Sequence, residues 1–170
     1  MRLGAHMSVS GGKHMALESG KEIGCESIQI FIRNVRSWSS SALKQEEIEK
    51  FIETRKKIKG IWPILSHNSY LINLASQEDE KLEKSYNAMI DELEKANQLE
   101  LDYVNMHPGV IPKKNQNLSS KEAMNQIADQ LNKLLEATKD SKVIILLETT
   151  AGQGKGLGPK FEHMKYIIDK

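Results

Sequence analysis

Two histidines and one glutamate stand where apolar stretches of this 170-residue chain end. His67 follows IWPILS, His107 follows DYVNM and Glu148 follows VIILL, with about 40 residues between successive members of the set. Imidazole nitrogens and a carboxylate oxygen suit Zn²⁺ with one position left open for water, and Mn²⁺ or Fe²⁺ would accept the same ligands. The pattern therefore predicts a metal site, provided that the three stretches are neighbouring strands.

Each member of this set also has a plainer interpretation. Taken alone, His67 or His107 is better explained as a hydrogen-bonded histidine at the end of a strand. Glu148 is harder to explain in this way, because it follows five apolar residues and a buried carboxylate needs a cation or hydrogen-bond donors. The metal site thus depends on the three residues occurring together.

The segments that position these residues alternate between short apolar runs and longer amphipathic ones. Strands are expected at residues 2–6, 27–31, 61–66, 102–106 and 143–147. Within the third run, Pro63 argues against a central strand. Helices are expected at residues 13–23, 44–59 and 82–96, behind a capping box of Ser119 and Glu122, and from Lys160 onward.

Repeated β-α units of this kind indicate an α/β fold with a parallel sheet, whose strands end at a common rim. Two architectures fit the pattern. One is an open, doubly wound sheet, and the other is a (β/α)₈ barrel, which needs about 250 residues. In the second case this chain would supply about five of the eight units.

Loops at the expected rim carry further candidates. RNVRSW, after the second strand, combines two arginines with an asparagine and a tryptophan. Arginine can hold a phosphate, and tryptophan can stack on a base or sugar. Tyr70 lies just beyond the third strand, and His6, at the end of the first, is expected to support the metal ligands from behind. A solvated loop and a packing tyrosine are the alternatives.

The overall charge gives little indication of a partner. The chain has 24 Lys and Arg and 23 Asp and Glu, so DNA binding would have to come from a local patch. The single cysteine, Cys25, suits a reducing compartment, and no signal-peptide pattern or membrane-length apolar stretch is seen. A cytoplasmic location is therefore expected, with no membrane partner and with nucleoid association if the source is prokaryotic.

The motifs of the chain resemble those of one family. GAHMSVSGG, NVRSW, SHNSYLINLAS, NMHPG and ETTAGQGKGLGPKFEHM occur in the order found in endonuclease IV. The resemblance runs along the whole chain and implies a TIM-type (β/α) barrel with a trinuclear zinc site. It also implies a DNA-repair endonuclease that hydrolyses the phosphodiester 5′ to an abasic site by a metal-activated hydroxide. The products would carry 3′-hydroxyl and 5′-deoxyribose phosphate ends.

The resemblance assigns roles to the three residues at the strand ends. His67 and His107 look like ligands of one zinc, and Glu148 looks like the catalytic carboxylate that bridges this zinc to a second. The family's later strands supply an Asp-x-x-His pair, another His, an Asp-x-His pair and a final Glu, none of which follows in this sequence. At most one zinc site is therefore largely complete within it.

The resemblance also assigns the DNA contacts. Arg36 and Tyr70 match positions that enter double-stranded DNA beside a flipped-out abasic nucleotide. Asn34 and Trp38 match the same DNA-contacting loop, in which Val35 replaces the family's usual residue. Abasic duplex DNA is thus the partner that the resemblance implies.

On this interpretation, residues 1–170 form a single domain, the N-terminal part of an endonuclease barrel that is expected to be inactive alone. The family is expected to be monomeric, whereas an incomplete sheet is expected to self-associate through its open edges. Two alternatives stay open. A divalent-metal sugar isomerase or epimerase barrel would also place His and Glu at strand ends, although it needs no Arg/Trp loop. The other is a non-catalytic fragment that binds DNA.

Overall fold

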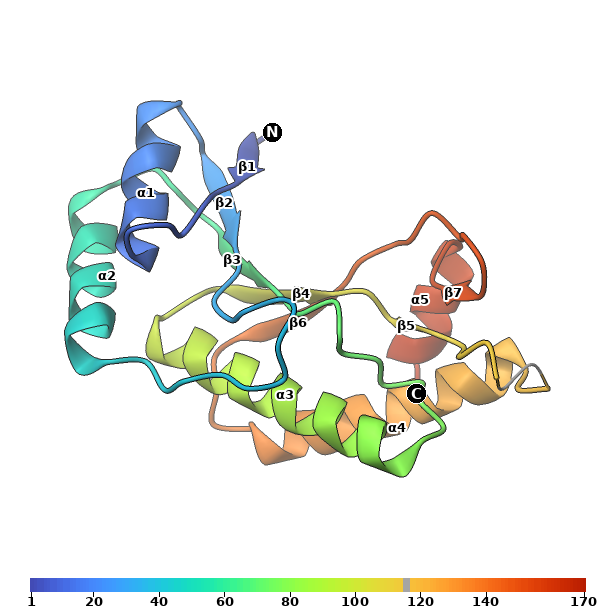
Figure 1. Cartoon of the computed structure of the whole chain (residues 1–170). Coiled ribbons are helices and arrows are strands. Elements are labelled where there is room, and N and C mark those ends of the chain that lie inside the picture. The colour runs from blue at the N-terminus through green and yellow to red at the C-terminus, as the bar shows by residue number, and fades with distance from the viewer. Residues whose placement is uncertain (115–116) are drawn as a thin grey trace.

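The computed structural model describes residues 1–114 and 117–170 and contains a five-stranded parallel sheet (Figure 1). Its strands lie in chain order, as β1 (Gly4–His6), β2 (Ser27–Ile30), β3 (Ile64–His67), β4 (Tyr103–Met106) and β6 (Ile144–Leu147). The helices that follow them are α1 (Lys13–Glu22), α2 (Gln45–Lys57), α3 (Asp79–Gln98), α4 (Ser120–Ala137) and α5 (Phe161–Ile168). A doubly wound sheet reverses its strand order and a barrel does not, so the sequential order selects the barrel architecture. The predicted α/β class and the five β-α units are confirmed.

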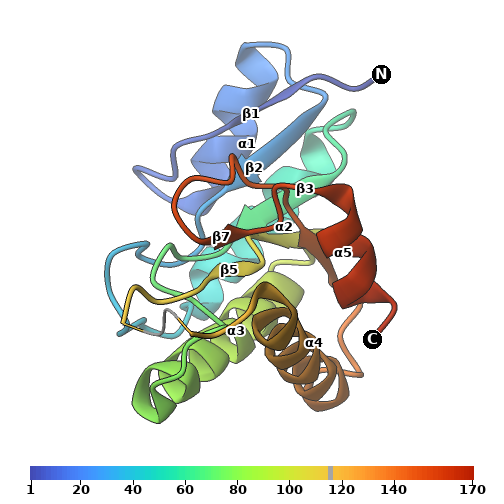
Figure 2. The ribbon, with the colours of Figure 1, turned by 90° about the vertical axis from the view of Figure 1, so that its right-hand side faces the viewer.

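The helices cover one face of the sheet. Ile28, Ile30 and Val104 point toward them and are buried, whereas Gln29 and Tyr103 alternate with these residues and are only partly buried. Figures 1 and 2 show the helices along the outer side of the curved sheet, as in a barrel wall. None of the helices in the described part of the chain has the length and apolar character that crossing a membrane requires.

Strand β3 corrects the expectation for the third apolar run. It begins at Ile64, directly after Pro63, and it lies centrally between β2 and β4. Pro63 therefore does not have to donate within the sheet, and its carbonyl accepts a hydrogen bond of 3.3 Å from the Ile28 N–H. The strand ends at His67, one residue beyond the expected run.

Helix α4 begins at the capping box that the sequence predicts. The Ser119 Oγ accepts a hydrogen bond of 3.2 Å from the Glu122 N–H, and the Glu122 carboxylate accepts from the Ser119 N–H at 2.9 Å. The Ser119 hydroxyl also donates to the Glu122 carboxylate at 2.7 Å, and this hydrogen bond, followed by the one from the Ser119 N–H, lowers the pKa of Glu122. The start of the helix that covers β4 and β6 is thus fixed locally.

Two short strands form a second sheet that the sequence analysis does not predict. β5 (Gly109–Val110) lies in the loop after β4, and β7 (Gly156–Leu157) lies in the loop after β6. They pair antiparallel and lie side by side (Figure 2). Strands of two residues carry no alternation that a sequence pattern can reveal.

The β6 edge of the five-stranded sheet is open, because no strand within the described ranges pairs with its far side. A pocket of about 360 Å³ between α4, β6 and α5 adjoins this edge. Three aliphatic side chains that line it are exposed, Leu135 at 53%, Ile144 at 56% and Ile168 at 71%. An unpaired apolar strand is a template for pairing with a second chain.

We therefore expect the 170-residue chain to self-associate in a concentration-dependent manner and Ile144→Lys to shift it toward monomer, since a charge on an edge strand opposes pairing. Size-exclusion chromatography with light scattering measures this shift. Ile23→Lys, at a 64% exposed site after α1, is the matched control and should leave the association unchanged. A monodisperse wild-type monomer at tens of micromolar would contradict the prediction.

Candidate metal centre

The structure brings His67, His107 and Glu148 together at the C-terminal ends of β3, β4 and β6. One ligand atom from each side chain lies within 4.8 Å of the other two. His67 is buried, and the other two are partly buried. The expected convergence is therefore present, while the role of the three residues as metal ligands stays a prediction.

The ring of His67 is held with one nitrogen directed at the other members of the group. Its Nδ1 lies 2.9 Å from the Asn68 carbonyl oxygen, and because a carbonyl only accepts, Nδ1 donates the hydrogen. In the neutral ring Nε2 then carries the free lone pair, and it lies 3.3 Å from Glu148 Oε2. A metal-binding histidine usually donates the N–H of its other ring nitrogen to a backbone carbonyl or a carboxylate, as His67 does to the Asn68 carbonyl.

His107 and Glu148 complete a donor set that fits a divalent cation. The His107 Nδ1 is buried and has no hydrogen-bond partner among the described residues. Such a nitrogen is costly to bury unless something outside the polypeptide satisfies it. The Glu148 side chain is 42% exposed, so the group opens toward solvent on the carboxylate side. Two imidazoles and one carboxylate with an open side can hold a metal ion.

A row of polar side chains behind the ligands connects Glu148 to His6. Asn105 donates to Glu148 Oε2 and also to Gln29 Oε1 at 3.2 Å, and the Gln29 Nε2 donates to His6 Nδ1 at 3.2 Å. Partial desolvation of the His6 ring, followed by the electrostatic effect of the neighbouring His67, lowers the pKa of His6. This row places His6 where the sequence analysis expects a supporting residue.

Sequence analysis missed Gln29 and Asn105, although a signal was available. Each is a polar residue inside an otherwise apolar strand, and Asn105 precedes His107 by two residues. Since side chains two apart in a strand point to the same side, Asn105 had to share the inner face with the predicted ligand.

Aromatic rings extend the site beyond the ligands. The Tyr70 ring centroid lies 5.9 Å from that of His67, and the Tyr70 side chain is 67% exposed. Phe31, which the sequence analysis did not single out, contacts the rings of His6 at 4.3 Å and of His67 and Tyr70 at 5.8 Å. Phe31 therefore packs between the histidines and the exposed tyrosine.

The Asn34–Trp38 segment lies beside this cluster and is open to solvent. Asn34, Arg36 and Trp38 are exposed, as their predicted role requires. The Asn34 Oδ1 is already engaged, because it accepts a hydrogen bond of 2.9 Å from the Arg36 N–H. The Ser69 Oγ donates to the Val35 carbonyl at 2.9 Å, which joins this segment to the loop that carries Tyr70.

The other arginine of the motif has a structural position. Arg33 is buried, and its guanidinium donates to the carbonyls of Ala88 and Trp38 and lies 3.2 Å from Asp91 Oδ2. Lys95, also buried, pairs with the same Asp91 at 2.8 Å. Arg33 thus fastens the exposed segment to α3, which leaves Arg36 as the arginine of this motif that faces solvent.

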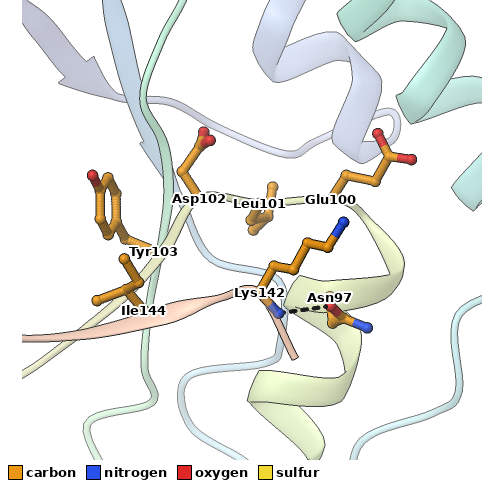
Figure 3. Close-up of a pocket in the computed structure, with 7 residues that line it drawn as sticks. All are labelled: Asn97, Glu100, Leu101, Asp102, Tyr103, Lys142 and Ile144. Atoms are coloured by element: carbon orange, nitrogen blue, oxygen red, sulfur yellow. Dashed lines mark hydrogen bonds between the residues drawn. The ribbon is translucent and has the colours of Figure 1, made fainter. Parts of the chain in front are cut away.

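A second pocket, of about 510 Å³, lies at the opposite end of the sheet, where β4 and β6 begin (Figure 3). Its charged residues have opposite signs, since Lys142 lines it together with Glu100 and Asp102. The Asp102 carboxylate is bound to Arg55 at 3.1 Å and to the Ile64 N–H at 2.8 Å. Because Asp102 already has partners and no histidine lines the pocket, it does not resemble the candidate metal centre.

Three comparisons place the chain among known proteins. Residues 17–170 match the family described as xylose isomerase-like TIM barrel. A protein named probable endonuclease 4 from Chloroflexus aurantiacus is 40% identical over 168 residues, which are 99% of this chain and 57% of that protein. The crystal structure of endonuclease IV from Thermus thermophilus superposes with a TM-score of 0.83 at 32% identity, covering 99% of this chain and 59% of that one.

A D-tagatose 3-epimerase-like protein shares the fold, with a TM-score of 0.75 at 20% identity over 99% of this chain and 61% of its own. The chain therefore spans less than two thirds of these relatives and structures. The resemblance to endonuclease IV drawn from the motifs is confirmed at the level of sequence and fold. From the match over residues 17–170, the chain belongs to the xylose isomerase-like TIM barrel family.

Proposed function

We propose that this protein is a metal-dependent DNA-repair endonuclease that hydrolyses the phosphodiester 5′ to an abasic site, leaving 3′-hydroxyl and 5′-deoxyribose phosphate ends. The observation that carries the proposal is the convergence of His67, His107 and Glu148 beside the exposed Tyr70. The 40% identity to a protein named probable endonuclease 4 supports it. We propose a cytoplasmic location for this activity, with association to the nucleoid, where its substrate would lie, if the source is prokaryotic.

His67, His107 and Glu148 would hold a Zn²⁺ ion, for which two nitrogens and one carboxylate oxygen are a common set. Mn²⁺ or Fe²⁺ would accept the same donors. When bound, the ion lowers the pKa of a water molecule and offsets negative charge on the phosphate. The family resemblance implies three such ions, and the described residues contain one group of three converging ligands.

The protein groups would position the carboxylate and the substrate. Asn105 holds the Glu148 oxygen that also faces His67, so the catalytic carboxylate is fixed before substrate arrives. The Glu148 side chain is partly exposed, so it would remain accessible to a substrate. His6 supports this arrangement at the far end of the Gln29 and Asn105 row.

The exposed loop residues would contact the DNA. Tyr70 is exposed beside His67 and would fill the space beside an abasic nucleotide, with Arg36 entering from the neighbouring loop. From that loop, Trp38 and Asn34 would contact the sugar-phosphate backbone or a base of the DNA. A sugar epimerase would require none of these exposed side chains, and the 20% identical epimerase-like structure shows a shared fold alone.

The length of the relatives limits what the 170 residues would do alone. We propose that they form the N-terminal part of a monomeric barrel and that, in isolation, they have little incision activity. A single metal site would leave the departing oxygen unassisted, because in multi-metal sites a second ion stabilises the leaving group.

We expect Tyr70→Ala to weaken binding to a duplex with one abasic site about tenfold, while binding to intact duplex changes little. Loss of one stacking contact, worth ~1–3 kcal/mol, gives this magnitude. The dissociation constants for both duplexes are measured at one fixed salt concentration, since phosphate contacts make both salt-dependent.

Trp62→Ala is the control for this experiment. Trp62 is 49% exposed and lies just before β3, at the end of the sheet opposite to the candidate metal ligands. It should leave both dissociation constants unchanged. A wild-type protein with no preference for abasic DNA would count against the proposed function, and equal losses on both duplexes would reject the lesion-specific role of Tyr70.

A further inference from the structure

The side chain of Asn73 pairs with β5 as a neighbouring strand would. Its Nδ2 donates to the Val110 carbonyl at 2.8 Å, and its Oδ1 accepts from the Val110 N–H at 3.1 Å. On its other side β5 pairs with β7. One carboxamide therefore takes the place of a third strand and satisfies both backbone groups of Val110.

Gly109 makes this close approach possible. Its φ is +146°, outside the range that other residues readily adopt, and a Cβ built there would lie 2.8 Å from Asn73 Oδ1. The glycine of the NMHPG motif thus serves the Asn73 contact as well as the turn after His107.

Asn73 is itself firmly held. Its N–H donates to the Ser85 Oγ of α3 at 3.0 Å, and its carbonyl accepts from the Ser76 N–H at 3.1 Å. Its neighbours Ile72 and Leu74 are buried in the core. The carboxamide is therefore presented from a fixed point on the helical framework.

Asn73 connects the three loops that follow β3, β4 and β6, the strands at whose ends the candidate ligands lie. Asn73 lies six residues after His67, and it binds β5, which begins two residues after His107. Through β7 the connection reaches the loop that follows Glu148. His107 has no hydrogen-bond partner for its buried Nδ1 among the described residues, so the backbone that follows it and the packing of its ring against His67 are what position it.

We infer that Asn73 is a positioning residue of the metal centre, which holds the loops after β3, β4 and β6 in the register that lets His67, His107 and Glu148 bind one ion. The inference rests on the proposed metal site and adds to it a residue that touches no ligand atom. Removing a group that supports metal ligands from outside typically costs about 10–100-fold in metal affinity.

The test compares Asn73→Ala with Gln126→Ala in the 170-residue chain. Gln126, on α4, donates to the carbonyls of Leu74 at 3.0 Å and Ser76 at 2.7 Å and accepts from the Gln77 side chain, so its loss removes three hydrogen bonds from the same loop without touching β5. Zinc affinity is measured by competition with a chromophoric chelator, Co²⁺ absorption reports the ligand geometry, and thermal unfolding reports stability.

We expect both variants to lose similar stability, and only Asn73→Ala to lose zinc affinity, by about tenfold or more, and to change the Co²⁺ spectrum. Asn73→Asp, which keeps the shape and the acceptor but not the donor, carries the test if Asn73→Ala does not fold, and it should also weaken zinc binding. A folded Asn73 variant with wild-type zinc affinity, or equal affinity losses in both alanine variants, would overturn the inference. A wild-type chain that binds no zinc would instead reject the metal site on which it rests.

Discussion

Replacing any one of His67, His107 or Glu148 is expected to lower the zinc affinity of the chain by at least about a hundredfold, because loss of a proposed direct ligand should exceed the roughly 10–100-fold cost of losing a supporting group. The suitable changes are His67→Ala, His107→Ala and Glu148→Gln. The glutamine keeps an oxygen that can accept from Asn105, so this variant removes the charge with little change in packing. Competition titration with a chromophoric chelator measures the affinities.

The control is His163→Ala. His163 lies on α5, where its Nδ1 accepts a hydrogen bond from the Gly158 N–H at 3.2 Å, and it is no member of the convergent group. Its replacement should leave the zinc affinity unchanged. If the three ligand variants bound zinc as tightly as the His163 variant, the site would not be at the ends of β3, β4 and β6.

The convergence of His67, His107 and Glu148 was predictable because it follows from the order of the strands along the chain. Parallel strands in sequential order end at one rim, so residues at equivalent positions of β3, β4 and β6 must meet there. His107 and Glu148 each follow the last residue of a strand, and His67 ends one. Residue type and spacing together were therefore sufficient, even though the start of β3 was misplaced.

The parts that were not predictable depend on contacts between loops. Whether an arginine in RNVRSW faces solvent or the core depends on where α3 places Asp91, and nothing local to the motif distinguishes Arg33 from Arg36. Likewise, the pairing of Asn73 with Val110 requires two loops to be placed first. Residue type states what a side chain can bond, and tertiary structure decides which partner it meets.

Glu92 shows a related conflict between pattern and residue type. The helical period of Met89 and Ala96 puts Glu92 on the buried face of α3, whereas its charge favours solvent. In the structure Glu92 lies on the face of α3 that the helical period predicts to be buried, and it is fully buried. One carboxylate oxygen accepts from the Ser66 hydroxyl of β3, and the other has no hydrogen-bond partner among the described residues.

Burial, with a smaller contribution from the charge of Asp91, raises the pKa of Glu92 to about 7. The Ser66 hydrogen bond and the charges of Arg33 and Lys95 act in the opposite direction and lower this pKa. A carboxyl group whose pKa is higher in the folded than in the unfolded state stabilises the fold when protonated. That contribution is fully present below the ordinary pKa of 4.5 and is lost as the pH rises through about 7. At about 1.36 kcal/mol for each unit of pKa difference, the free energy of unfolding should fall by about 3 kcal/mol on this account.

Glu92→Gln cannot ionise, so it should remove this part of the pH dependence. We expect its free energy of unfolding, minus that of the wild type, to increase by about 3 kcal/mol from about pH 4 to about pH 8. Urea unfolding at low protein concentration across this range measures the difference, in which the titrations common to both proteins cancel. Glu94→Gln changes an exposed glutamate on the same helix and should follow the wild type. A difference between Glu92→Gln and wild type that stays constant across the range would mean that Glu92 titrates alike in the folded and unfolded chains, and that its burial is compensated by partners other than those described.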